Sequence, residues 1–213
     1  MSRTLTVGAA QMGAIQRADT RADVVERLIA LLHHGAEAGC DLVVFPELAL
    51  TTFFPRWYVQ DRSEFDHFFE TELPGPETRP LFDEASRLGV GFHLGYAELT
   101  PDGRHFNTAI LVERDGSIAG LYRKVHLPGH HEHEPWREFQ HLERYYFEPG
   151  DGFGVYGAFG GVLGMAICND RRWPETYRML GLQGCELALI GYNTPIHYPP
   201  DPSQDALQGF HNR

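Results

Sequence analysis

Apolar residues follow two different spacings along this chain. Between residues 21 and 38 they recur at helical spacing, and Thr20 and Gly39 are suited to begin and end an amphipathic helix there. Shorter helices are predicted at 79–88 and at 174–180, where Pro174 suits the first turn.

Elsewhere the apolar residues form short continuous runs, which are typical of strands buried in a sheet. These runs predict strands over residues 4–10, 41–46, 89–96, 106–114, 117–124, 153–156, 161–168 and 186–190. Asp115-Gly116 lies between two of them and predicts a hairpin. Because helices alternate with single strands and strand pairs, we expect a layered α/β domain with mixed sheets.

Two segments depart from this pattern. Residues 125–150 are rich in histidine, glutamate and aromatic residues and are too long for a simple connection, so we expect a functional loop there. Residues 199–204 are typical of a loop, and residues 205–213 resemble the first turns of a helix. A natural domain rarely stops at such a point, so we expect the complete protein to continue.

Length and composition indicate an ordinary globular chain. The 213 residues correspond to about one domain to one and a half, and 42% of them are apolar and 22% charged. No apolar run reaches the roughly 20 residues of a membrane-spanning helix, and residues 1–4 lack a signal-peptide pattern. A net charge of -11 without a basic cluster disfavours nucleic acid and anionic membranes as partners. We therefore expect a cytoplasmic protein that acts on a small molecule.

Cysteine and lysine are both used sparingly. Cys40, Cys168 and Cys185 show no Cys-x-x-Cys spacing, so any cysteine chemistry belongs to a single thiol. Of the 18 basic residues all but Lys124 are arginine. The two residue types replace each other on a surface, but not where a compact ammonium group is required. Lys124 is therefore a candidate functional residue, and chance survival of one surface lysine is the alternative.

Two other patterns are weak indicators of a cofactor. Residues 152–157 match the Gly-x-Gly-x-x-Gly dinucleotide pattern, but strand-like sequence follows where that motif needs a helix. Several side chains after residue 125 would suit a metal ion: His126, His130, His131, Glu132, His133 and Glu134. Because the His-Glu-x-x-His spacing is missing, we favour a solvated loop and expect no metal or other cofactor.

Cys168 ends an apolar strand and directly precedes a predicted helix start. The first turn of a helix supplies free N–H groups and partial positive charge, which lower a thiol pKa and stabilise an oxyanion. Cys40 and Cys185 fit the usual description of buried, inert thiols. We therefore interpret Cys168 as the candidate nucleophile.

Three segments together resemble the signature of the carbon-nitrogen hydrolase (nitrilase) superfamily. They are Phe45-Pro-Glu47 after a buried strand, Tyr122-Arg-Lys124-Val-His126 after a hairpin, and Cys168 at its elbow. Longer stretches resemble the N-carbamoyl-D-amino-acid amidohydrolases: residues 45–57, 126–130, 139–143, 168–175 and 191–195. The resemblance covers essentially the whole chain.

The resemblance implies an αββα sandwich made of one domain over residues 1–213, with roughly the last third of the family's chain missing. It also implies a cofactor-free enzyme that forms homo-oligomers and hydrolyses N-carbamoyl-D-amino acids to the D-amino acid, ammonia and carbon dioxide. Beyond the three signature residues, it implies a second carboxylate, Glu143, which orients Lys124 and water, and two pocket histidines, His126 and His141.

The implied division of labour follows the needs of amide hydrolysis. Cys168 attacks the carbamoyl carbon, while Glu47 takes the thiol proton and later gives it to the departing nitrogen. The ammonium group of Lys124 and the backbone N–H of Asn169 hold the oxyanion. Water activated by Glu47 then cleaves the thioester-like intermediate.

Arg171 and Arg172 stand next to each other at a predicted helix start. Two positive charges are unfavourable at the positive end of a helix, so an anionic partner explains them better than a solvated surface does. We interpret that partner as the α-carboxylate of the substrate. Asn193 and Thr194, at the end of the following strand, are expected to complete the clamp.

Three other interpretations remain open at this stage. The chain could be a related aliphatic amidase or ureidopropionase-like enzyme, in which Arg171 would not bind a carboxylate. It could be a metal-dependent hydrolase that uses the histidine-rich loop. Finally, it could be an inactive subunit or fragment that only associates with other chains.

Overall fold

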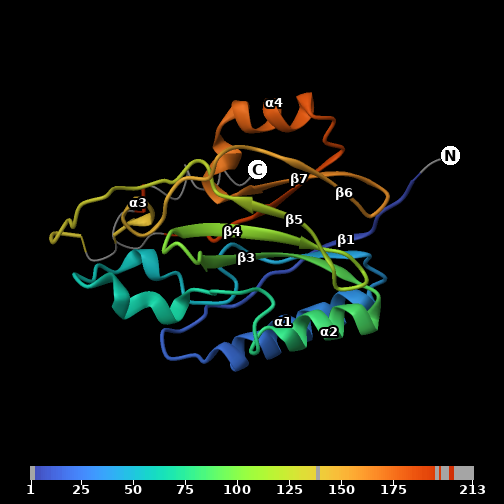
Figure 1. Cartoon of the computed structure of the whole chain (residues 1–213), viewed down its shortest axis with the longest axis horizontal. Helices are drawn as coiled ribbons and strands as arrows, with labels where there is room; N and C mark the ends of the chain where they lie inside the picture. Colours follow the sequence, from blue (N-terminus) through green and yellow to red (C-terminus); the bar gives the residue numbers. More distant parts are fainter. Residues whose placement is uncertain (1–2, 138–139, 195–196, 198–201, 204–213) are drawn as a thin grey trace.

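Two β-sheets lie face to face in the computed structural model, which describes residues 3–137, 140–194, 197 and 202–203 (Figure 1). Within these residues, one sheet has the strand order β1 (Val7–Ala9), β2 (Leu42–Val44), β3 (Gly91–Leu99), β4 (His105–Val112) and β5 (Ile118–Arg123). The other has the order β6 (Val155–Ala158), β7 (Gly161–Ile167) and β8 (Leu187–Gly191). The helix expected over 205–213 lies outside the described residues.

Both sheets are mixed, as the sequence predicts. β1, β2 and β3 run parallel, and β3, β4 and β5 then form antiparallel pairs. In the other sheet β6 and β7 are antiparallel, while β7 and β8 are parallel. The connection from β1 to β2 contains α1 (Arg21–Glu37), which begins where predicted because Thr20 and Asp23 form a reciprocal capping box.

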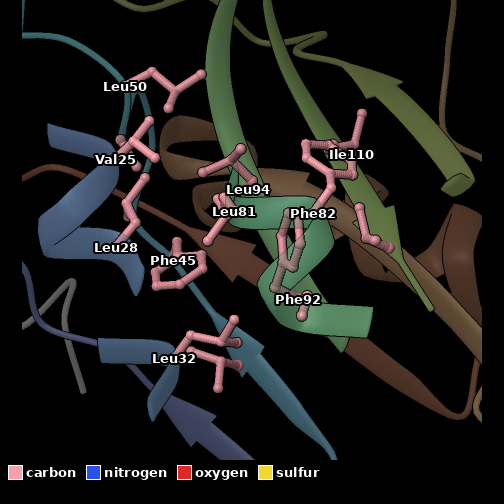
Figure 2. Close-up of a cluster of buried hydrophobic side chains, with 14 of the residues drawn as sticks. Val25, Leu28, Leu32, Phe45, Leu50, Leu81, Phe82, Phe92, Leu94 and Ile110 are labelled. Atoms are coloured by element: carbon pink, nitrogen blue, oxygen red, sulfur yellow. The ribbon is translucent and has the colours of Figure 1, made fainter. Parts of the chain in front are cut away.

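Helices cover the outer faces of the two sheets. α1 and α2 (Arg79–Leu88) pack on the five-stranded sheet, and Figure 2 shows the apolar side chains between them, including Leu28, Phe82 and Phe92. α4 (Pro174–Leu182) covers the three-stranded sheet, where Leu180 packs so closely on Gly164 that an added Cβ would lie 2.8 Å from it. The fold is therefore an αββα sandwich (Figure 1).

A second apolar core fills the space between the sheets. It contains side chains from both of them, among others Leu42, Ala109, Leu111, Tyr122, Leu163, Met165, Ile167 and Leu189. No strand pairing joins the two sheets in the part of the chain that the structure describes. Side-chain packing therefore sets the position of one sheet relative to the other.

Three short helices fall in segments for which the sequence predicts neither a helix nor a strand. They are η1 (Phe54–Arg56), η2 (Arg62–Phe68) and α3 (Glu143–Tyr146), and the last lies inside the expected 125–150 loop. Phe54 of η1 lies where the three helices meet. Its ring contacts the rings of Phe65, Phe68, Phe69, Tyr146 and Phe147. Contacts between distant aromatic residues stabilise these short helices, and such contacts leave no periodic pattern in the sequence.

The glycine-rich motif and the first strand can also be compared with the fold, and β1 is shorter than the predicted 4–10. Strand β6 begins at Val155, inside the glycine-rich 152–157 motif, so this motif does not open a helix as a dinucleotide site would. Among the described residues, no helix has the length and apolar character needed to cross a membrane.

Candidate active site

The backbone around Glu47 runs through a narrow slot just after strand β2. Gly95 of β3 and Gly191 of β8 form its walls: a Cβ on Gly95 would lie 2.9 Å from the Glu47 Cα, and one on Gly191 would lie 3.2 Å from the Glu47 N. Leu48 then adopts the left-handed conformation, with φ of 50°. Two glycines from different sheets therefore hold Glu47 at the centre of the molecule.

Lys124 follows β5 and lies between two carboxylates. Its Nζ donates to Glu47 Oε1 at 2.7 Å and to Glu143 Oε2 at 2.5 Å. All three side chains are buried, with exposed fractions of 0–1%. A buried ammonium group is stable only when it is paired in this way, which gives a physical reason for the single lysine of the chain.

Cys168 lies at the junction of β7 with a short 3-10 helix, η3 (Cys168–Arg172). Its φ of 44° is unusual for a residue with a side chain and is typical of a strained functional position. The thiol Sγ lies 3.4 Å from Thr194 Oγ1, and Arg171 Nη1 donates to it at 3.5 Å. The N–H of Asn169 falls in the first turn of η3, where such groups have no partner within the helix. The elbow predicted from the sequence is confirmed.

Asp170 fixes this elbow and was not identified from the sequence. Its buried carboxylate accepts hydrogen bonds from the N–H of Ile167 at 2.9 Å and from the hydroxyl of Tyr122 at 2.7 Å. It also accepts from both the backbone N–H and the Nδ1 of His126, each at 2.9 Å. One carboxylate thus connects the Cys168 turn to the segment that carries Lys124.

The two expected pocket histidines each contact a carboxylate. His126 contacts Asp170 and stacks on the ring of Trp173. His141 Nε2 lies 3.2 Å from Glu143 Oε1, on the side away from Lys124. In these positions both histidines support the carboxylates of the site.

The expected carboxylate clamp is only partly assembled around the thiol. Arg171 reaches Cys168, its own side chain also donating to the Cys168 carbonyl at 2.7 Å, and its Nη2 lies 3.4 Å from Thr194 Oγ1. Arg172 is exposed, next to it on η3. Asn193 uses its backbone N–H to donate to Glu47 Oε2 at 3.2 Å.

A cavity of about 810 Å³ opens beside these residues. Glu47, Asn193 and Thr194 lie in its wall, and the Cys168 thiol contacts that wall through Thr194. The cavity extends toward Arg56 and Trp57, so there is room for a substrate larger than a simple amide.

The histidine-rich loop does not gather metal ligands in the part of the chain that the structure describes. No group of three or more His, Cys, Asp or Glu side chains there could hold a metal ion. His133 stacks on Tyr58 with ring centroids 4.1 Å apart, and His130 lies 3.8 Å from Glu134. Within these residues the geometry gives no support to a metal-dependent hydrolase.

Comparison with known proteins identifies the family of this chain. The profile of the carbon-nitrogen hydrolase family matches residues 6–209, which is nearly the whole chain. This chain is a carbon-nitrogen hydrolase of the nitrilase superfamily.

Individual relatives of this carbon-nitrogen hydrolase are longer than the chain itself. It is 30% identical to N-carbamoylputrescine amidase of Solanum tuberosum over 207 residues, which is 97% of this chain and 63% of the relative. A carbon-nitrogen hydrolase from Helicobacter pylori superposes with a TM-score of 0.79 at 24% identity, covering 97% of this chain and 65% of that one. The chain spans less than two thirds of the length of both.

A third comparison concerns the cysteine. The amidase from Nesterenkonia sp. AN1 superposes with a TM-score of 0.68 at 20% identity, covering 89% of this chain and 67% of that one. Its structure shows acrylamide added at the active-site cysteine. At this level of identity the likeness establishes the shared fold.

The two carboxyl groups of this carbon-nitrogen hydrolase differ in their pKa values. Burial, reinforced by the neighbouring Glu143 and opposed by Lys124, raises the pKa of Glu47. Burial acts on Glu143 in the same direction, but Lys124 and His141 outweigh it and lower the pKa of Glu143. Glu143 is thus held as a permanent anion, while Glu47 can both take up and release a proton.

Burial also dominates the pKa of the Cys168 thiol. Desolvation and the nearby charge of Glu47 raise this pKa to about 11, although Lys124 acts in the opposite direction. The sequence analysis expected the helix start to lower the thiol pKa, and this expectation is wrong because η3 is short and the sulfur is buried. A neutral thiol therefore needs a base, and Glu47 is suited to that role.

Alkylation of Cys168 should accelerate with pH far beyond the neutral range. Because its pKa is raised to about 11, the thiolate fraction is small near neutrality and grows about tenfold per pH unit. Iodoacetamide labelling from about pH 7 to pH 10, followed by peptide mass spectrometry, measures this rate. A Cys185→Ala variant serves as the control and should give the same profile. A labelling rate that is already constant above about pH 8 would contradict the raised pKa.

Proposed function

We propose that this carbon-nitrogen hydrolase hydrolyses N-carbamoyl-D-amino acids through a cysteine-bound intermediate, releasing the D-amino acid, ammonia and carbon dioxide. The observation that carries the proposal is the guanidinium group of Arg171, which contacts the Cys168 thiol and Thr194. A carboxylate bound by this group would lie close to the reacting carbonyl. The D configuration comes from the sequence resemblance to the N-carbamoyl-D-amino-acid amidohydrolases.

The reaction uses side chains that the fold already brings together. Cys168 attacks the carbamoyl carbon as Glu47 takes its proton, and Glu47 returns this proton to the nitrogen that leaves. Lys124 donates to two carboxylate oxygens, and in this proposal its third N–H bond donates to the developing oxyanion. The N–H of Asn169 is the second donor in this proposal. Water, deprotonated by Glu47, then cleaves the thioester-like intermediate.

The charge beside the thiol distinguishes this substrate from that of the potato relative. That protein is named for N-carbamoylputrescine. In this compound the carbamoyl nitrogen is neutral, and the free amine at the other end of the chain is cationic near neutral pH. Here Arg171 donates a hydrogen bond to the thiol of the proposed nucleophile. Arg172 is close enough to interact electrostatically with both Arg171 and Cys168. Two positive charges at this point favour an anionic substrate and disfavour a cationic one.

Replacing Arg171 with alanine should raise KM for N-carbamoyl-D-amino acids by about tenfold or more, since a hydrogen bond to a charged group is lost. KM for an uncharged N-carbamoyl alkylamine should change little. The measurement is steady-state ammonia release with both substrates and with the L enantiomer. The matched control is Arg178→Ala, an exposed arginine on α4.

Three outcomes would count against the proposed substrate or part of it. An equal loss for the charged and the uncharged substrate would mean that Arg171 only supports the Cys168 turn through its bond to the Cys168 carbonyl. Faster hydrolysis of N-carbamoylputrescine than of any N-carbamoyl amino acid would favour the cationic amide, and equal rates for D and L substrates would remove the stereochemical part.

A further inference from the structure

Asn107 is a buried polar residue on strand β4, next to the catalytic carboxylates. Its Nδ2 donates to Glu47 Oε1 at 2.8 Å and lies 3.4 Å from Glu143 Oε2. These are the same two oxygens to which Lys124 Nζ donates. One oxygen of Glu47 and one of Glu143 are therefore each within hydrogen-bond distance of two donors, the charged Lys124 ammonium and the neutral Asn107 amide.

The orientation of the Asn107 amide is determined by these contacts. With the amide reversed, its carbonyl oxygen would face two carboxylate oxygens, and this would be repulsive. In the observed orientation Oδ1 is buried and has no hydrogen-bond partner among the described residues. Leaving an acceptor unpaired is unfavourable, so the contacts of the NH2 group are retained in spite of that loss.

Asn107 also acts on the lysine through its backbone. Its carbonyl oxygen accepts the N–H of Lys124 at 2.9 Å, at the point where β5 ends. During the proposed reaction the ammonium group of Lys124 has to serve a third negative group, the oxyanion, in addition to the two carboxylates. The amide cannot change its protonation state and continues to hold them, so the direction of Glu47 does not depend on the lysine alone.

We propose that Asn107 is a positioning residue that keeps Glu47 aimed at the Cys168 thiol while Lys124 also donates to the oxyanion. The inference rests on the proposed function, because it takes Glu47 as the base of a cysteine-dependent hydrolysis. It concerns the geometry of the base and is independent of the side chain or configuration of the substrate.

The test compares Asn107→Leu with Thr108→Val, a matched control at the next position. Thr108 is equally buried, and its hydroxyl likewise donates to a carboxylate, Glu98 Oε2, at 2.7 Å, on the opposite face of β4. Asn107→Leu should lower kcat by about tenfold or more, the effect of losing a hydrogen bond to a charged group, with KM nearly unchanged. The control should keep kcat within about threefold, because Glu98 has no part in the chemistry.

A pH profile separates positioning from a general loss of structure. Because the Asn107 amide stabilises the charged form of Glu47, its removal should move the acidic limb of kcat to higher pH. The pH dependence of iodoacetamide labelling of Cys168 should also shift, without any substrate, because the charge of Glu47 acts on the pKa of the thiol. Labelling that shifts while no N-carbamoyl compound is hydrolysed would leave the positioning role standing and overturn the proposed function alone.

Asn107→Asp carries the test if the leucine variant does not fold. This variant has the same size but donates only when its new carboxyl is protonated, so its deficit should shrink as the pH falls. A deficit that is equal at every pH, or an Asn107→Leu profile that superposes on the wild type in both kcat and labelling, would overturn the inference.

Discussion

Replacing Cys168 with alanine should abolish hydrolysis, lowering kcat by at least about 10⁴-fold, because the variant has no group to form the covalent intermediate. Of the three thiols, this one lies at the elbow, contacts Thr194 and falls within the field of Glu47 and Lys124. The measurement is ammonia release by the variant, combined with mass spectrometry of the intact protein after alkylation.

The controls for this result are the other two cysteines. Cys40 and Cys185 are half-buried at the edges of the structure, so Cys40→Ser and Cys185→Ala should retain nearly full activity. If iodoacetamide inactivates the wild type in step with modification of either of these residues, and Cys168→Ala still turns over, the assignment of the nucleophile is wrong.

Lys124→Arg should lose at least about 10²-fold in kcat, which is the effect of removing one oxyanion donor. The Nζ fits between Glu47 and Glu143 at 2.7 and 2.5 Å in a space with no exposure to solvent. A planar guanidinium group is larger and places its donors in a fixed fork, so it cannot serve both carboxylates and the oxyanion from this position.

Arg123→Lys provides the matched control at the adjacent position. Arg123 pairs with Glu98 through two hydrogen bonds of 2.7 and 2.6 Å, away from the thiol. Its replacement should change kcat by less than about threefold. Near-normal turnover of Lys124→Arg, measured under the same conditions, would contradict the requirement for a lysine at this position.

The extent to which the sequence predicts the fold depends on the length of each element. α1 and the hairpin strands follow from periodicity and capping, because their own residues carry the signal. The helices around Phe54 do not, since aromatic side chains separated by about 90 positions stabilise them. The first strand is also shorter than predicted and covers only Val7–Ala9.

The sequence predicts those site residues whose residue type is unusual for their position in the chain. A single lysine, and a cysteine at the end of a strand, are visible without a structure. Asn107 lies within an apolar strand, and Asp170 stands at a helix start, where an acidic residue is ordinary. Their roles depend on the side chains that pack against them from the other sheet or from a neighbouring strand, and no local pattern contains that information.

The division of the site between two sheets makes the thickness of the core a catalytic parameter. Glu47, Asn107 and Lys124 belong to the five-stranded sheet, whereas Cys168 follows the three-stranded one. The apolar side chains packed between the sheets, together with the hydrogen bonds of Asp170, set the spacing between them. A misplacement of about 1 Å can cost roughly 10²-fold in rate. In the proposed mechanism, ordinary apolar residues such as Ala109 and Met165 would therefore act as a spacer, because their volumes would affect the distance between base and nucleophile without any change of a polar group.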